Sequence, residues 1–264
     1  GGQGTNNESG HTYVAWNWKA GTAFSNDASS TGVGSIDSSG SVNTDVGFSI
    51  ISYTGTGSAG TIAHGLGVVP EWIIVKRRDS ASNGDWFTYV STLGNQKAMF
   101  LNLNNAVGGD AAGPWNSTTP TTSVFSIGTS TGTNASSGTY IAYCFASVDG
   151  YSKFGSYTGN NNADGPFVYT GFRPAFVMIK DTTVAGNWIM YDSTRDDVNV
   201  AYKMLAANSS GAESTNSSIG HIDFLSNGFK LRDNSNDSHA GQASGATPIY
   251  MAFAEQPFKY ANAR

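Results

Sequence analysis

The stretch GLGVVPEWIIVKRRD, residues 65–79, contains the pattern that decides the fold. Pro70 introduces a short apolar run rich in β-branched and aromatic residues, and charged residues end it, which is typical of a β-strand. A second version of this stretch, YTGFRPAFVMIKDT, begins at Tyr169. Its Pro174 and Lys180 correspond to Pro70 and Lys76 at one constant spacing, so the chain contains an internal repeat.

The repeat extends well beyond these two runs. GFSIISYTGTG, from Gly47, matches GYSKFGSYTGN, from Gly150, and GDWFTYV matches GNWIMYD. Each copy ends with a Tyr-x-Ala-aromatic segment, TYIAYCFAS from Thr139 and PIYMAFAE from Pro248. The two copies begin at Gly47 and Gly150, and a repeat as long as this separation is a whole domain rather than a solenoid unit or a propeller blade. The paired positions include Tyr53 and Tyr157, Gly55 and Gly159, and Trp86 and Trp188.

The repeat predicts two modules, at residues 47–149 and 150–264. HTYVAWNWKAG, residues 11–21, is a third Tyr-x-Ala-aromatic segment, so we expect residues 1–21 to be the closing strand of an upstream module. Residues 22–46 contain almost no large apolar side chains and are predicted to form a linker. Since no such spacer separates the two modules, we expect them to pack at a fixed angle.

Short strand-like runs separated by Gly, Asn and Ser turns recur in both copies. WIIVKR, DWFTYV, AMFLNL and TSVFSI are of this kind in the first copy, and FVMIKD in the second. In HIDFLSNGFKLRD, Asn227-Gly228 lies between two apolar runs, which predicts a β-hairpin with a type I′ turn. The predicted fold class is all-β, with tandem antiparallel β-sandwich modules.

Composition narrows the classes of function. Charged residues make up 12% of the chain and the formal net charge is −5. Since about 25% is usual in soluble domains, polarity comes here from Gly, Ser, Thr and Asn, and the basic surface needed for nucleic acid is not expected. No run approaches the roughly 18 apolar residues of a membrane span. The single cysteine, Cys144, lies among apolar residues and is expected to be buried.

Candidate catalytic groups are few. Asp192, Asp196 and Asp197 could supply the carboxylate pair of a glycosidase, but Arg195 favours an ion pair with Asp192 that fixes the loop. The sequence contains no G-x-S-x-G motif, no phosphate-binding loop motif and no pair of histidines at metal-ligand spacing. We therefore predict no enzymatic activity, no catalytic residues and no cofactor.

The polar run DNSNDS contains a weak candidate for a calcium site. Asp233, Ser235 and Asp237 have the i, i+2, i+4 spacing of oxygen ligands in a calcium loop. Ser238 and Ser244 stand where an EF-hand needs Gly and Glu, which excludes that motif. A solvated turn is the simpler interpretation, so we assign no metal.

Aromatic residues give the clearer indication of binding. Trp115 stands alone in the loop AAGPWNSTT and is followed by Asn116. An exposed aromatic ring can stack on a sugar while neighbouring amides bind its hydroxyl groups; the alternative is a Trp115 ring folded back onto the sheet. Tyr157 with Asn160 and Asn161 forms a second candidate ligand-binding patch.

The order of these motifs resembles a repeat of tail-fibre and virion-surface proteins from tailed bacteriophages, notably phages of marine bacteria. Such repeats read YTG, then G-x-x-P-x-x-V-x-I-K-x-R, D-S-x-R, S-x-G-F and a closing Tyr-Val-Ala-Trp strand. The second copy keeps YDSTR and SNGF, the first keeps PEWIIVKRR, and HTYVAWNWKAG is close to the closing strand. The resemblance covers nearly everything except residues 22–46. It implies jelly-roll modules similar to concanavalin-type lectins, on the virion surface.

From the resemblance we expect a non-enzymatic, extracellular virion structural protein. It would be the C-terminal part of a tail fibre or adhesin that contacts a glycan or protein on the host surface. Such fibres are usually trimers, so copies of this chain and other virion proteins are expected partners. Two alternatives are a capsid or tail decoration protein with purely structural contacts, and a glycan depolymerase.

Overall fold

The computed structural model describes residues 9–80, 84–108, 112–216, 220–233 and 243–256. These residues form an all-β fold of antiparallel sheets with only short helical turns.

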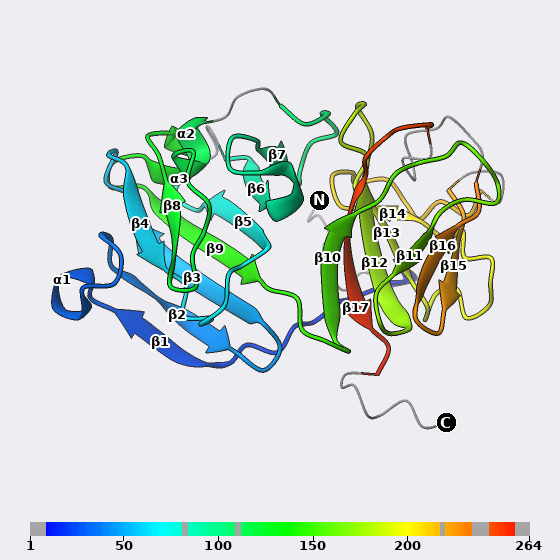
Figure 1. Cartoon of the computed structure of the whole chain (residues 1–264), viewed down its shortest axis with the longest axis horizontal. Helices are drawn as coiled ribbons and strands as arrows, with labels where there is room; N and C mark the ends of the chain where they lie inside the picture. The colour runs from blue at the N-terminus through cyan, green and yellow to red at the C-terminus, as the bar shows by residue number, and fades with distance from the viewer. Residues whose placement is uncertain (1–8, 81–83, 109–111, 217–219, 234–242, 257–264) are drawn as a thin grey trace.

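Two β-sandwich modules lie side by side (Figure 1). We call them the N-terminal module, residues 22–149, and the C-terminal module, residues 150–256.

A seven-stranded sheet, in the order β1-β2-β3-β9-β5-β6-β7, forms one layer of the N-terminal module. The two-stranded sheet β4-β8 forms the other layer, with the short helix α2 beside β8. The bounds are β1 Thr22–Asn26, α1 Ala28–Thr31, β2 Ser38–Asn43, β3 Phe48–Thr54, β4 Gly60–Ala63, β5 Trp72–Arg77, β6 Trp86–Val90, η1 Ser91–Leu93, β7 Met99–Phe100, α2 Ala112–Trp115, β8 Val124–Ile127, α3 Thr131–Asn134 and β9 Thr139–Phe145.

The C-terminal module pairs a five-stranded sheet, β10-β17-β12-β13-β14, with a three-stranded sheet, β11-β16-β15. The bounds are β10 Ser152–Ser156, β11 Phe167–Tyr169, β12 Pro174–Lys180, β13 Ile189–Asp192, β14 Leu205–Ala206, β15 Ile222–Leu225, β16 Gly228–Leu231 and β17 Ile249–Ala254.

Five strands of each large sheet occur in the same order. The order β3-β9-β5-β6-β7 in the seven-stranded sheet corresponds to β10-β17-β12-β13-β14 in the five-stranded sheet. With Trp72 matched to Phe176, the residues opposite them are Phe145 and Phe253, whereas the Tyr-x-Ala-aromatic motif matches Tyr143 to Phe253, so the closing strand is shifted by two residues relative to its motif. The two copies of the sequence repeat therefore share one topology.

The central strands of both large sheets are buried on both faces. In β5, Ile73 and Val75 point into the core of the N-terminal module, whereas Trp72 and Ile74 point toward the other module. Burial on both faces explains why these strands are continuous apolar runs rather than alternating ones. Cys144 of β9 is fully buried, as predicted, and burial raises the pKa of its thiol to about 12.

A shared aromatic cluster joins the two modules. Phe145 of β9 lies 6.2 Å from Phe253 of β17, and the rings of Trp72 and Trp188 lie 6.0 Å apart. The indole Nε1 of Trp188 also donates a 2.9 Å hydrogen bond to the carbonyl oxygen of Phe100 in the other module. The apolar contact and the cross-module hydrogen bond hold the modules together, as the absence of a spacer predicted.

The linker predicted at residues 22–46 is wrong. β1 and β2 are antiparallel strands that extend the seven-stranded sheet beyond β3, and α1 connects them. In these strands Ser25 and Ser39 face solvent, Phe24 and Val42 pack against the core of the module, and backbone hydrogen bonds complete the pairing. Asp27 caps α1 by accepting a hydrogen bond from the Ser30 amide.

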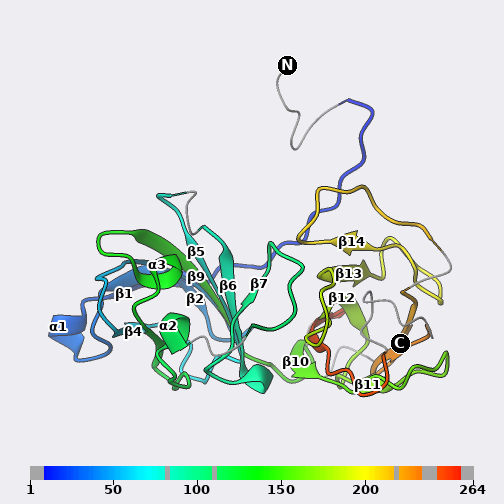
Figure 2. The ribbon, with the colours of Figure 1, turned by 90° about the horizontal axis from the view of Figure 1, so that it is seen from above.

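The closing strand expected within residues 1–21 is also not formed in the described part of that segment. From residue 9 to residue 21 the chain runs without strand pairing, alongside the C-terminal module and across to β1 (Figure 2). Trp18 contacts Phe145, Phe176 and Phe253 at centroid distances of 6.4, 6.1 and 5.3 Å. The aromatic residues that suggested a strand instead cover the shared cluster.

The predicted hairpin is confirmed, but its type I′ turn is wrong, because the turn lies one residue earlier and neither of its central residues has a positive φ. β15 and β16 pair with Leu225 opposite Gly228, so Ser226 and Asn227 form the turn. Gly228 belongs to β16, and a Cβ there would lie 2.1 Å from the carbonyl oxygen of Val168. The glycine is therefore needed for the close approach of β11 rather than for a positive φ.

Candidate functional site

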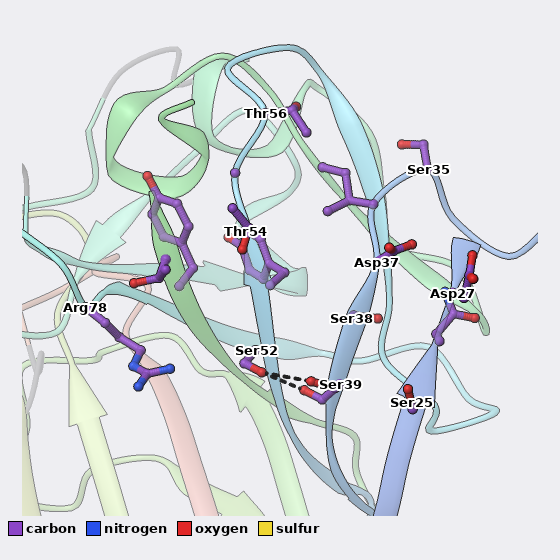
Figure 3. A pocket seen from close by; sticks show the side chains of 16 residues that line it. Ser25, Asp27, Ser35, Asp37, Ser38, Ser39, Ser52, Thr54, Thr56 and Arg78 are labelled. Carbon is purple, nitrogen blue, oxygen red and sulfur yellow. Dashed lines mark hydrogen bonds between the residues drawn. The ribbon is translucent and has the colours of Figure 1, made fainter. Parts of the chain in front are cut away.

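An open polar groove lies at one end of the seven-stranded sheet, where β1, β2, β3 and β9 end or begin (Figure 3). Its volume is about 780 Å³. Most of its lining side chains carry hydroxyl groups. The serines and threonines of the lining are Ser25, Ser35, Ser38, Ser39, Ser52, Thr54, Thr56 and Thr139.

A row of serines crosses three strands on the solvent side of the sheet. Ser25 of β1 lies opposite Ser39 of β2, and Ser39 lies opposite Ser52 of β3. The Ser52 hydroxyl donates a 3.0 Å hydrogen bond to the Ser39 carbonyl oxygen and lies 3.2 Å from the Ser39 hydroxyl (Figure 3). These side chains present donors and acceptors to a ligand along the strand-pairing direction.

Two stacked tyrosines form the buried wall of the groove. The rings of Tyr53 and Tyr140 are 5.1 Å apart and nearly parallel, at 13°. The Tyr53 hydroxyl donates to the Thr133 carbonyl oxygen at 2.7 Å. The Tyr140 hydroxyl donates to the Thr131 carbonyl oxygen at 2.8 Å and accepts from the Ala135 amide at 2.7 Å. Burial raises the pKa of both phenols, so they act as neutral supports.

Charged groups lie on opposite sides of the groove. Figure 3 shows Arg78 on one side and Asp27 with Asp37 on the other. Hydrogen bonds to Asp27, first from the Ser29 hydroxyl and then from Ser30, lower the pKa of its carboxyl group. Arg78 is exposed, and its guanidinium forms no ion pair with the described residues. The groove therefore offers a free cation and two acceptor groups around a hydroxyl-rich floor.

None of the sequence-predicted ligand residues lines this groove. Trp115 is only 2% exposed and packs edge-to-face on Tyr89, with ring centroids 5.8 Å apart. The prediction that Trp115 contacts a ligand is wrong, because α2 turns its indole into the core of the N-terminal module. Asn116 is exposed beside it, in a left-handed conformation with φ of 51°.

The second predicted patch is divided between the core and the surface. Tyr157 packs against the core of the C-terminal module, 6.2 Å from the ring of Phe229, and burial raises its pKa well above the usual value. Its ring is partly buried by this packing, so only part of it faces solvent. Asn160 and Asn161 are exposed in the loop before β11, and the Asn160 side chain donates to the Asp164 carbonyl oxygen at 3.1 Å.

The calcium candidate is only partly within the described residues. Ser235 and Asp237 lie outside them. Asp233 is buried, and its carboxylate accepts a 2.5 Å hydrogen bond from the Gly220 amide. Within the described ranges no group of three or more acidic, His or Cys side chains is placed to hold a metal ion.

The acidic segment after β13 forms the predicted ion pair. Arg195 Nε lies 2.5 Å from Asp192 Oδ2, and the backbone amide of Arg195 donates to Asp192 Oδ1 at 2.9 Å. Asp196 accepts from the amides of Tyr202 and Lys203 at 2.8 and 2.6 Å. Because these carboxylates are occupied by donors of their own loop, they hold its conformation.

Sequence reasoning missed the groove because its residues come from segments far apart in the chain. Ser25 and Asp37 belong to the stretch predicted to be a linker, whereas Arg78 follows β5 and Thr139 begins β9, two strands assigned only to the framework. A usable signal was the polar run after Tyr53 in the SYTG motif, because Thr54 leads directly into the groove. That motif marks the end of β3.

These features define a class: a pair of antiparallel β-sandwiches with an open, hydroxyl-rich groove at one sheet end. The chain belongs to the family described as a domain of unknown function (DUF7483), whose model matches residues 1–257. Searches of curated proteins and of solved structures gave no match. Among the described residues, no helix is long and apolar enough to cross a membrane.

Proposed function

We propose that this chain is a non-enzymatic virion-surface protein of a tailed bacteriophage, part of a tail fibre or adhesin that binds a host-surface ligand. The groove at the end of the seven-stranded sheet is the proposed contact site. The motif resemblance described above supports the virion assignment, and copies of the chain in a homo-oligomer, with a trimer as the expected form, would raise avidity without new contacts.

The hydroxyl-rich lining of the groove is the observation that carries this proposal. Eight serine and threonine side chains, together with Asp27 and Asp37, can exchange hydrogen bonds with a polar surface ligand. The Arg78 guanidinium can bind an acidic group, because no described carboxylate neutralises it. A host glycan or a polar protein loop has this combination of groups.

Two observations favour this function over the alternatives. The large exposed apolar side chains of the described residues come from both modules and are mostly valines, which is little apolar area for the subunit interface of a decoration protein. Of the three carboxylates that a depolymerase would use, Asp192 and Asp196 are bound by donors of their own loop, and Asp197 is exposed, so they do not form an acid/base pair in a cleft.

A binding screen with matched variants tests the proposal. The purified chain should bind one or more bacterial surface polysaccharides on an array, and Arg78→Ala should weaken that binding at least about fivefold. Lys153→Ala removes another exposed cation, on β10 outside the groove, and should leave binding unchanged. Equal binding by the Arg78 variant and the native chain would remove the groove from the proposal.

The virion assignment needs a separate experiment. Gold-labelled antibodies raised against this chain should decorate particles of the phage that encodes it, at the tail or on the outer surface. If the antibodies do not label the particles, but a denaturing gel of the same particles shows a band of this chain's mass, the chain is an internal component and the assignment is contradicted.

A further inference from the structure

The outer face of the three-stranded sheet carries two exposed aromatic side chains. Phe167 and Tyr169 of β11 are 45% and 64% exposed, and the buried Val168 lies between them in the sequence. Side chains alternate across a strand, so both rings stand on the same, solvent-facing side of the sheet. Two large rings in this arrangement make an apolar platform on the C-terminal module, away from the groove.

Glycines leave the backbone beside these two rings without bulky side chains. Gly228 lies opposite Tyr169 in the β11-β16 pair, and a Cβ at Gly228 would lie 2.9 Å from the Phe167 ring. The Phe167 ring therefore rests over bare backbone. A Cβ atom at Gly171 would lie 3.6 Å from the Tyr169 hydroxyl oxygen. No bulky side chain at either glycine position raises the surface beside the rings.

The charged groups around the platform are paired with one another. Lys230 lies opposite Phe167 and forms an ion pair with Asp164 of the preceding loop. Arg232 and Asp223 form a second ion pair, with 3.4 Å between nitrogen and oxygen. Because these opposite charges neutralise each other, the platform suits an uncharged ligand better than a polyanion.

The loop before β11 supplies hydrogen-bonding groups at the edge of the platform. The ion pair between Asp164 and Lys230 brings this loop against the sheet, beside Phe167. Asn160 and Asn161 are exposed in the same loop; the Asn160 side chain is already bonded to the Asp164 carbonyl oxygen and the Asn162 amide, which leaves the Asn161 side chain to meet a ligand. Amide side chains can both donate and accept, which matches the hydroxyl groups of a sugar.

We infer that Phe167 and Tyr169 form a stacking site for a neutral saccharide, separate from the groove. A pyranose ring presents C–H groups on one face and hydroxyl groups at its edge, and so matches flat aromatic rings bordered by amides. Addition of a β-strand from another chain is the less suitable use of this edge. β11 is only three residues long, and Pro166 precedes it, and both features oppose strand pairing.

Affinity electrophoresis tests this inference directly. The intact chain would be run in native gels containing dextran, laminarin, mannan or galactan, with alginate as the acidic comparison. We expect retardation by at least one neutral polymer and little by alginate. Tyr169→Ala should weaken the neutral retardation at least about fivefold, whereas Tyr169→Phe should keep most of it because the ring remains.

Two controls separate this site from other causes. Val198→Ala removes a side chain of the same module that is 69% exposed, and should change nothing. Arg78→Ala should leave the retardation by neutral polymers unchanged, so this result does not depend on whether the groove binds a ligand. The inference is overturned if no neutral polymer retards the chain or if the Tyr169→Ala variant is retarded like the native chain. It is also overturned if sedimentation shows that the only effect of Tyr169→Ala is to dissociate a dimer.

Discussion

The two modules share a framework and differ in what is added to it. In the N-terminal module β1 and β2 extend the large sheet beyond β3, whereas in the C-terminal module the equivalent strand β10 is the edge. The C-terminal module instead has a third strand, β15, in its smaller sheet. The groove uses residues of β1 and β2, and the aromatic platform lies on the sheet that gained β15. The groove therefore depends on an addition to the repeat, whereas the platform residues lie on β11, which pairs with β16 and not with the added β15.

The interface between the modules should give the largest effect. Trp188 is fully buried in the shared cluster, while its counterpart Trp86 is only half-buried. Trp188→Ala should lower the free energy of unfolding by about 4 kcal/mol, since it leaves a cavity and removes the hydrogen bond to Phe100. Urea unfolding followed by circular dichroism measures this loss. Trp86→Ala should lower the free energy of unfolding clearly less, and equal losses would contradict the different roles given to the two tryptophans.

Equivalent lysines should respond in opposite ways. Lys180 is buried, and burial lowers the pKa of its ammonium group from 10.5 to about 8. Lys180→Met should therefore raise the stability at pH 7 by about 2 kcal/mol, because the charged form is costly to bury. Both ammonium groups donate to a carbonyl oxygen, Lys180 to Asp181 and Lys76 to Gly84, but Lys76 is only half-buried, so Lys76→Met should give no gain.

The pH dependence identifies the cause of the Lys180 effect. Between about pH 8 and 10.5 the unfolded chain holds a proton on Lys180 that the folded chain has lost, so native stability rises with pH in this window. The difference between native and Lys180→Met stabilities should shrink across it. The Cys144 thiol, whose raised pKa lowers stability above about pH 9, cancels in that difference. A constant difference would indicate a packing effect instead.

The closing-strand tyrosines should differ although their sequence motifs match. Tyr140→Phe removes a hydroxyl that bonds both the Ala135 amide and the Thr131 carbonyl oxygen, and should cost about 1–2 kcal/mol. Tyr250→Phe keeps the edge-to-face contact with Phe229 and should cost less than about 0.5 kcal/mol. Thermal unfolding of both variants provides the measurement. A larger loss at Tyr250 would reverse the assigned roles.

The cap of α1 should give the smallest effect. Asp27→Ala removes the acceptor for the Ser30 amide and should slightly lower the midpoint of thermal unfolding at pH 7. The carboxyl pKa is lowered in the folded chain, so its contribution is present above pH 3.8 and disappears as the pH falls through the lower, folded value. Native and variant midpoints should converge in acid. Asp27→Asn, which keeps an acceptor oxygen, is the matched control.

The fold was predictable where side chains carry the information. The apolar runs at Trp72 and Phe176 predict central strands, and their common spacing predicts one topology used twice. β1 and β2 could not be predicted in this way, because Phe24 and Val42 are their only large apolar side chains, and serine and glycine provide the backbone hydrogen bonds of a strand as well as any residue.

The candidate sites were less predictable for a geometric reason. Trp115 lies in a loop sequence that is equally compatible with an exposed or a buried ring, and only the path of α2 decides between them. Phe167 and Tyr169 alternate with Val168 in a pattern that identifies two faces but not which face is covered. Exposure depends on the second sheet, which the local sequence does not specify.

The contact between Phe145 and Phe253 has a consequence for assembly. These residues occupy equivalent positions, so at this point the modules meet as two subunits do in an isologous homodimer. Such a surface is complementary to its own kind, and each partner blocks the other from binding a third copy. A longer array built from this unit would therefore have to grow by pairs, with new contacts between one pair and the next.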